Sequence, residues 1–521
     1  MILGIGGFLH DAACAVIRDA AIVAAVEQKR IAKQERPGHL PFEAIAEVLR
    51  LAGGRDPVRC VAIARPFSAG SESELHIALR GMFPDSRLVV VEHHEAHAAS
   101  AFFASPFEQA TVLTLDRAGD FRCGVRWHGD GNRLTTEKEL FYPDSLGDLY
   151  GRVTELLGFH RNADEHKVQW LSTGGDGSWA GLFQEILGIG NGEDWPRLQT
   201  AWFDERRLTR GGFSARFYES LGLKDEADIP ASMREHIAAG IQAAIETAVL
   251  RMAGNAEHLC LAGGVGLNAL LVAALERTRC VYVQPASGNS GTALGAALFA
   301  NCVVLGNRRR APLEDICLGP AYSPEEIKTV LENCKLRFRY LLTTEELIET
   351  AVREINDQKI IAWMQGRMEF GPRALGNRSI LASPLNPYST ENLNTYIKHR
   401  EPFRKFAASV PAELASDYFE VGPNARFLAT VGRVLPAHRK TFASAVLGDG
   451  LVRVHTVHKQ DNPLYHRLLL AAGEKTGIPV LYNTSFNLFN DPLVCTPSDA
   501  VRSFYSSGVD ALFAGNFLVE K

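Results

Sequence analysis

Apolar runs of strand length alternate with helical patterns through roughly the first 300 residues of this chain. Residues 1–5, 12–17 and 22–27 read as strands arranged around a glycine turn. Apolar side chains then recur at spacings of three and four over 237–252, which predicts a long amphipathic helix. This alternation predicts an α/β fold in which helices cover sheets and ligand loops lie at the ends of the strands.

The length of the chain, 521 residues, exceeds what a single hydrophobic core usually organises. From Gly306 onward the sequence becomes charged and contains prolines, as linkers do. A further alternation of helices and strands follows. We therefore expect a first domain at 1–320, a linker region at 321–340 and a smaller α/β domain at 341–521.

Composition argues against several classes of protein. Hydrophobic residues make up 46% of the chain and the net charge is −5, so neither long disorder nor a general attraction to nucleic acid is expected. The one compact basic run, three arginines at 308–310, reads as a solvated linker. Residues 1–16 lack a basic n-region and are interrupted by His10 and Asp11, so we do not expect them to be a signal peptide, and no apolar run approaches the roughly 20 residues that span a bilayer. The nine cysteines form no CxxC pair, so we expect a cytoplasmic protein without a membrane partner.

A histidine pair suggests a metal site. His93 and His97 lie four residues apart in a predicted helix, so both imidazoles project from one face. Asp116 follows the predicted strand 110–115, at the position where α/β folds expose ligand residues. Two imidazoles and one carboxylate suit Fe, Zn or Mn. The alternative is that the histidines belong to an ordinary helix surface and that the aspartate caps a turn.

A second glycine turn suggests an anion site. Gly263 and Gly264 follow a predicted strand and precede a helix, where backbone N–H groups favour negative charge. The spacing differs from the GxGxxG of dinucleotide-binding folds, and an ordinary tight turn would read the same way.

Segment 365–379 is the most specific in the chain. It brings Arg367, Arg373 and Arg378 together with Gly371 and other glycines close to a predicted strand. Guanidinium groups bind phosphate through two parallel hydrogen bonds, and glycines let backbone amides join them. The segment therefore predicts a phosphate site. Further donors that we assign to it are Lys398, Arg400, Arg404, Ser485 and Asn487.

Taken together, these segments resemble the NodU/CmcH-type carbamoyltransferases nearly from end to end. The resemblance rests on 8–11, 92–102, 261–265 and above all 366–376, which reads Gly-Arg-Met-Glu-Phe-Gly-Pro-Arg-Ala-Leu-Gly. It implies an N-terminal domain with an actin-like (ASKHA) core, fused to a smaller C-terminal YrdC-like α/β domain.

The resemblance also implies an activity. In the family, the YrdC-like domain joins carbamoyl phosphate to ATP, which gives carbamoyl-adenylate and releases pyrophosphate. The intermediate moves to the N-terminal domain, where an acceptor hydroxyl displaces AMP. We therefore expect an ATP-dependent O-carbamoyltransferase that acts on a small hydroxylated molecule of secondary metabolism, such as an antibiotic precursor. A homodimer is compatible with this expectation.

Residue roles follow from the same resemblance. A divalent metal, expected to be Fe, would be held in the first domain by His93, His97, Asp116 and Asn289, while Mg would accompany ATP. Arg373 would be catalytic in the second domain. His10 is the candidate general base toward the acceptor hydroxyl, unless it is bonded to backbone and structural. The nucleotide-binding residues expected in the first domain are Gly119, Asp120, Lys167, Gly263, Gly264 and Asn268.

Two positions depart from the family pattern. Asn289 stands where family members usually carry an aspartate, and an uncharged amide oxygen should hold a metal less tightly. The turn that usually reads Asp-Gly-x-Gly-Asp is Asp-Arg-Ala-Gly-Asp at 116–120. Two alternatives therefore stay open: a tRNA threonylcarbamoyl-type modification enzyme, since both domains have relatives there, and a catalytically impaired nucleotide-binding protein, which Asn289 favours.

Overall fold

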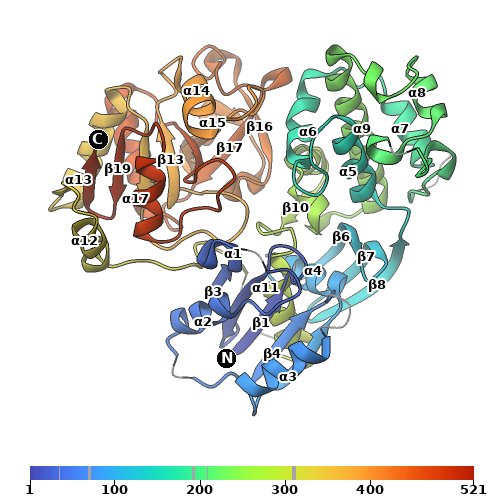
Figure 1. Ribbon diagram of the computed structural model, residues 1–521, viewed down its shortest axis with the longest axis horizontal. Helices are drawn as coiled ribbons and strands as arrows, with labels where there is room; N and C mark the ends of the chain where they lie inside the picture. The colour runs from blue at the N-terminus through green and yellow to red at the C-terminus, as the bar shows by residue number, and fades with distance from the viewer. Residues whose placement is uncertain (35, 55, 68–71, 190–193, 208, 308–311) are drawn as a thin grey trace.

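The computed structural model describes residues 1–521 except 35, 55, 68–71, 190–193, 208 and 308–311. The basic run predicted at 308–310 therefore lies outside the described residues. Figure 1 shows two parts, one from the N-terminus to the yellow-green elements and one from the α12 label to the C-terminus.

The first part contains two five-stranded sheets with the same topology, and this confirms the predicted α/β class. In each sheet three antiparallel strands are followed by two parallel ones. The first sheet, in the order β3-β2-β1-β4-β5, consists of β1 (Ile2–Gly6), β2 (Ala13–Arg18), β3 (Ala21–Glu27), β4 (Cys60–Ala64) and β5 (Arg87–Val91). The second sheet, in the order β10-β9-β6-β7-β8, consists of β6 (Gln109–Gly119), β7 (Arg122–Asp130), β8 (Arg133–Phe141), β9 (His258–Ala262) and β10 (Cys280–Val283).

Two helices lie between these sheets and fix their spacing. Helix α11 (Gly291–Phe299) packs on β1, β2 and β4, while α4 (His93–Phe102) packs on β6 and β9 and against α11. The contacts are close because small residues line them. A Cβ atom at Gly295 would lie 1.8 Å from the carbonyl oxygen of Ala96, and one at Gly4 would lie 2.0 Å from that of Ala293. Any side chain at either glycine would force these elements apart.

The long amphipathic helix predicted over 237–252 is confirmed as part of α9 (Ala231–Ala253). It carries the buried side chains of a helical layer over the second sheet. The other helices of the first part are α1 (Gln28–Ala32), α2 (Phe42–Leu51), α3 (Glu72–Met82), α5 (Leu146–Leu156), α6 (Glu165–Leu171), α7 (Ala180–Ile186), α8 (Ala215–Ser220) and α10 (Ala269–Glu276).

The second part is built on one mixed sheet of ten strands among the described residues, in the order β11-β20-β19-β12-β13-β18-β14-β17-β16-β15. Helices cover both of its faces, and two separate apolar cores lie beneath them. The strands are β11 (Arg339–Tyr340), β12 (Ile361–Met364), β13 (Arg378–Ala382), β14 (Ala407–Pro411), β15 (Phe419–Glu420), β16 (Val431–Val434), β17 (Leu451–Val457), β18 (Leu481–Ser485), β19 (Ala511–Ala514) and β20 (Phe517–Glu520). The helices are α12 (Pro324–Asn333), α13 (Thr344–Asn356), α14 (Ser389–Asn392), α15 (Ala415–Tyr418), α16 (Pro463–Thr476) and α17 (Pro497–Tyr505).

Segment 321–340, the expected linker region, carries helix α12 and strand β11. Ser323 caps α12 through a capping box, and Ile327 and Leu331 are buried in the core of the second part. Strand β11 pairs with β20 at the edge of the ten-stranded sheet. The charged residues of this segment therefore lie on the solvent face of an amphipathic helix. The segment is structurally part of the second part.

The two parts are joined by buried polar contacts. Asn424 donates to Glu276 at 2.7 Å and to the carbonyl of Val281 at 2.8 Å, and it accepts from the backbone of Val283 at 3.1 Å. Because a buried polar group left unpaired is costly, these bonds favour one relative placement of the two parts. No helix among the described residues is both long and apolar enough to cross a lipid bilayer.

Candidate functional site

The predicted metal ligands converge in the first part. Glu92 caps the start of α4 through a capping box, so the helix begins with His93 and presents His97 one turn later. Asp116 lies near the end of β6, beside this helix. Its Oδ2 atom is 2.9 Å from Nε2 of His93 and 3.3 Å from Nε2 of His97. One ligand atom from each of the three residues lies within 4.8 Å of the others, which is suitable for a single metal ion.

The charges of this cluster also suit a metal ion. Burial raises the pKa of Asp116, but the imidazoles of His93 and His97 outweigh it and hold this pKa well below its ordinary value. Burial lowers the pKa of His97, so its ring is neutral and can act as a ligand. His97 is fully buried, yet neither ring nitrogen has a hydrogen-bond partner of good geometry among the described residues. A metal ion would satisfy one of these nitrogens.

The neighbouring His94 has a different role. Its Nδ1 lies 2.9 Å from Oγ1 of Thr114, and its Nε2 lies 3.2 Å from the carbonyl of Arg122. Both nitrogens therefore connect α4 to the second sheet, which leaves no lone pair for a metal.

Glycines bring two backbone segments close to the cluster, the end of β6 and the turn at 263–264. A Cβ at Gly119 would lie 2.1 Å from Cδ2 of His93, and one at Gly264 would lie 3.1 Å from Oδ1 of Asp116. Gly263 has a φ of +93° and packs against the end of β6. The predicted turn at 263–264 therefore lies directly beside the predicted metal ligands.

Replacement of Gly119 by alanine should displace the His93 ring, because the added methyl group cannot share its position. We expect a loss of about 1–3 kcal/mol in the free energy of unfolding. Metal affinity should fall as well, as measured by titration of the metal-free protein. Gly181→Ala, where an added Cβ meets nothing within 4 Å, is the control. Unchanged metal affinity in Gly119→Ala would contradict the placement of His93 as a ligand.

The other residues predicted for the first part are more dispersed. His10 is exposed on the turn between β1 and β2, and Asn289 lies half-buried on the loop before α11 with its carbonyl accepting from Thr292. Oδ2 of Asp120 lies 4.0 Å from Nε of Arg65. A Cβ at Gly6, at the end of β1, would lie 2.3 Å from Oγ1 of Thr292, so the His10 turn and the Asn289 loop are neighbours.

Two predicted nucleotide residues have protein partners. Asn268 caps α10 and exchanges hydrogen bonds with Gln242 at 2.8 and 3.1 Å. Lys167 lies 3.0 Å from Glu401, a residue of the second part, and 3.2 Å from Asp164. Lys167 therefore lies where the two parts meet, close to the predicted phosphate segment.

In the phosphate segment, a buried carboxylate shapes the backbone. Oε1 of Glu369 accepts from the amides of Leu375, Asn377 and Arg378 at 2.8, 2.9 and 3.1 Å. These three bonds fold 369–378 back on itself and place Arg373 at the far end of the loop from the carboxylate.

The three arginines of this segment have different surroundings. Arg367 donates to the carbonyls of Gly319, Leu318 and Val23, and fully buried Arg378 donates to those of Gln365, Gly366, Asn377 and Pro320. Backbone oxygens thus occupy both guanidinium groups. Among the described residues Arg373 forms neither a hydrogen bond nor an ion pair through its side chain, so its guanidinium is available to a ligand.

Arg373 belongs to a cluster of four half-buried arginines that we call the arginine cluster: Arg373, Arg400, Arg404 and Arg453. Burial and the charge of Arg404 lower the pKa of Arg373 to about 10 and that of Arg400 to about 9. Burial and the other three arginines hold the pKa of Arg453 well below its ordinary value. Glu401 approaches the cluster, 3.6 Å from Arg404, but Lys167 shares it. The cluster is therefore rich in positive charge and suited to a multiply charged anion.

Sequence analysis missed two residues of this region. Arg453 lies in β17 between buried valines, and its guanidinium stacks at 5.1 Å on the ring of Trp170 from α6. His166, also on α6, has its pKa lowered to about 3 by burial and by the charges of Arg404 and Arg373. An arginine between two valines of a strand was the available signal for Arg453, whereas nothing in the sequence distinguished His166.

Three further predicted residues meet beside the cluster. Nζ of Lys398 donates to Oδ1 of Asn487 at 2.7 Å and to its carbonyl at 3.1 Å, and Ser485 donates to the same Oδ1 at 2.7 Å. Burial, followed by the charges of Arg400 and Arg404, holds the pKa of Lys398 well below its ordinary value.

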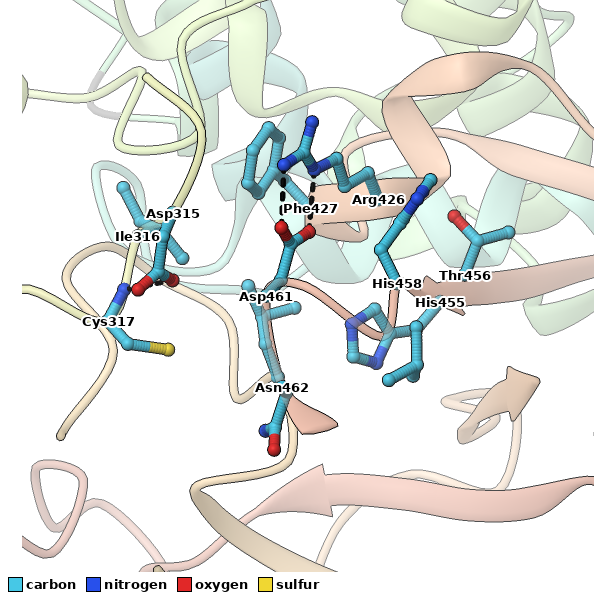
Figure 2. Close-up of a pocket in the computed structure, with 12 residues that line it drawn as sticks. Asp315, Ile316, Cys317, Arg426, Phe427, His455, Thr456, His458, Asp461 and Asn462 are labelled. Atoms are coloured by element: carbon cyan, nitrogen blue, oxygen red, sulfur yellow. Dashed lines mark hydrogen bonds and ion pairs between the residues drawn. The ribbon is translucent and has the colours of Figure 1, made fainter. Parts of the chain in front are cut away.

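A small closed cavity near this region does not coincide with the predicted site. Figure 2 shows residues that line it: the paired side chains of Arg426 and Asp461 lie near the centre of the view, with His455 and His458 to their right and Asp315 and Cys317 to their left. Its volume is about 20 Å³, which is room for roughly one water molecule. It cannot accommodate a nucleotide.

Two family models match separate stretches of this chain. The family model described as Carbamoyltransferase N-terminus matches residues 77–298, and the one described as Carbamoyltransferase C-terminus matches residues 352–521. An uncharacterized protein of Synechocystis sp. is 34% identical, over 100% of this chain and 96% of its own length. The nodulation protein NolNO of Sinorhizobium fredii is 31% identical over 99% of this chain and 79% of its own.

A relative with a named reaction matches a shorter stretch. The 3'-hydroxymethylcephem-O-carbamoyltransferase of Amycolatopsis lactamdurans is 32% identical over 50% of this chain and 48% of its own length. Among solved structures, HypF of T. kodakarensis covers 58% of this chain at 16% identity. Its TM-score of 0.34 is below the level at which a shared fold is inferred.

Proposed function

Because this chain belongs to the carbamoyltransferase family, we propose that it activates carbamoyl phosphate with ATP and transfers the carbamoyl group to a hydroxyl of a small molecule. The membership covers both parts of the chain. We further propose that the first part is an actin-like transfer domain and the second a YrdC-like activating domain. The acceptor would be a hydroxylated metabolite of secondary metabolism.

The observation that supports this proposal most directly is the arginine cluster. Four half-buried guanidinium groups are close enough for burial and the other three charges to lower the pKa of Arg453, and the half-buried carboxylate of Glu401 lies 3.6 Å from Arg404. Carbamoyl phosphate and the triphosphate of ATP together carry several negative charges, which would relieve this mutual repulsion. Hydrogen bonds to the same ligands would also come from the ammonium group of Lys398, the side-chain amide of Asn487 and the hydroxyl of Ser485.

In the proposed activation, carbamoyl phosphate, ATP and water give carbamoyl-adenylate, pyrophosphate and phosphate. Water hydrolyses carbamoyl phosphate to carbamate and phosphate, and a carbamate oxygen then forms a bond to the α-phosphorus of ATP. Pyrophosphate is the leaving group. The arginine cluster would stabilise the charge that develops on the phosphoryl oxygens. Mg bound to ATP would neutralise part of the negative charge of the triphosphate.

For the transfer step, His93, His97 and Asp116 would hold a divalent metal, with Asn289 as a fourth candidate. The bound metal would act as a Lewis acid toward an oxygen of the carbamoyl-adenylate. The exposed imidazole of His10 would accept the proton of the acceptor hydroxyl, and the turns at 119–120 and 263–264 would receive the nucleotide phosphate.

Exchange of labelled pyrophosphate into ATP tests the activation step. We expect exchange that depends on carbamoyl phosphate, because the adenylate forms reversibly before any acceptor is needed. The reaction without carbamoyl phosphate is the control. Absence of exchange in the full-length protein with Mg and both substrates would refute the adenylate mechanism.

A further inference from the structure

A five-residue helix of the first part, α1, reaches the phosphate segment of the second part. Arg30 on this helix is buried, and its Nη1 donates to the carbonyl of Glu369 at 2.7 Å while Nη2 donates to the carbonyl of Gly371. The Nε side of the same guanidinium is paired with Glu27, which is also buried. One planar group therefore holds two carbonyls just before Arg373 in the chain.

A second segment of the first part also lies against this loop. Gly371 has a φ of +109°, and a Cβ there would lie 3.3 Å from Cβ of Ala286, on the loop that continues to Asn289. The backbone at 369–371 is thus enclosed between α1 and this loop, and Arg30 supplies the hydrogen bonds. The carboxylate of Glu369 orders only the later amides, from Leu375 to Arg378.

Helix α1 is itself fixed to the His10 turn. The amide of Gln28 donates to the carbonyl of Ala12 at 2.8 Å, and Lys29 forms an ion pair with Asp11. The guanidinium of Arg30 is consequently anchored in the first part and can define where the loop of the second part lies. Figure 1 shows α1 on the side of the first part that faces the second.

We propose that Arg30 is a positioning residue for Arg373, and that the first part in this way sets the anion-binding geometry of the second. The inference rests on the proposed function for the identity of the anion. Arg30 makes no contribution of its own to the ligand. Arg30 holds the carbonyls of Glu369 and Gly371, and these in turn determine where Arg373 lies in the arginine cluster.

The test measures binding of inorganic pyrophosphate to the full-length protein by calorimetry. Arg30→Gln cannot donate the paired hydrogen bonds, and we expect it to weaken pyrophosphate binding about tenfold. Arg30→Lys retains the charge and one donor and should lose less. The matched control is Lys33→Gln at the end of the same helix, which breaks the 2.7 Å ion pair to Asp499 and should bind pyrophosphate as the wild type does.

A double-mutant cycle separates positioning from general destabilisation. If Arg30 acts through Arg373, then Arg30→Gln should have little further effect on binding in an Arg373→Lys background. Equal effects in both backgrounds, or wild-type binding by Arg30→Gln, would overturn the inference. Thermal unfolding of each variant shows which ones are folded, and Arg30→Lys serves if Arg30→Gln is not.

The same measurement distinguishes this inference from the proposed function. Wild-type protein that binds pyrophosphate but shows no exchange into ATP would refute the adenylate mechanism and leave the role of Arg30 to be judged from binding. Wild-type protein that does not bind pyrophosphate would overturn both.

Discussion

Replacement of Arg373 with alanine is expected to lower kcat/KM for pyrophosphate exchange by about 10²–10³-fold. This guanidinium has no recorded protein partner among the described residues, so its loss removes ligand contacts without leaving a protein group unpaired. Burial and the charge of Arg404 lower its pKa to about 10, and a bound anion would offset both effects. The readout is the exchange rate as a function of carbamoyl phosphate and of ATP.

A control for this variant must lose a positive charge from the same part of the chain. Arg433→Ala is suitable, because Arg433 pairs at 2.9 Å with the exposed Asp449 and does not belong to the arginine cluster. We expect its exchange rate to equal that of the wild type. Exchange at the wild-type rate in Arg373→Ala itself would remove the strongest support for an anion site in the cluster.

Replacement of His97 with alanine is expected to remove the metal. The imidazole is fully buried, and its nitrogens lack partners of good geometry, so a bound ion is the simplest way to satisfy it. Loss of a residue that merely orients a metal ligand costs roughly 10–100-fold in affinity, and loss of a ligand should cost more. Mass-spectrometric metal analysis of the purified protein should show about one ion per chain in the wild type and almost none in the variant.

The same variant should retain pyrophosphate exchange, because the arginine cluster lies in a different part of the molecule. His94→Gln is the matched control. It breaks the contacts to Thr114 and to the carbonyl of Arg122, so it should unfold at a lower temperature but keep the metal. Full metal content in His97→Ala would mean that the histidines are structural. Equal loss of exchange and metal would mean that the two half-reactions are not separate.

The convergence of His93, His97 and Asp116 could be predicted from the sequence because two local rules lead to it. Helical periodicity placed His93 and His97 on one face, and the end of a strand exposed Asp116. The arginine segment was harder to interpret, because sequence spacing does not reveal the direction of a side chain. Arg367 and Arg378 point to backbone carbonyls, whereas Arg373 does not.

Two other residues could not be predicted from the sequence, for a related reason. Arg30 lies 339 residues along the chain from Glu369, whose carbonyl it contacts, and His166 lies more than 200 residues from Arg373 and Arg404. Only the packing of the two parts brings these residues together. The region expected as a linker was misleading in another way. The charges of α12 belong to a solvent-facing helix surface, and a linker has a similar composition.

The arginine cluster has a consequence for the ligand-free protein. Four neighbouring cations repel one another, and this repulsion lowers the free energy of unfolding when no anion is bound. Any anion that binds there stabilises the protein by mass action. Sulfate or phosphate in a buffer should therefore raise the melting temperature while competing with substrate. Chloride or a large organic anion should do neither, and assays in phosphate buffer would underestimate the activity.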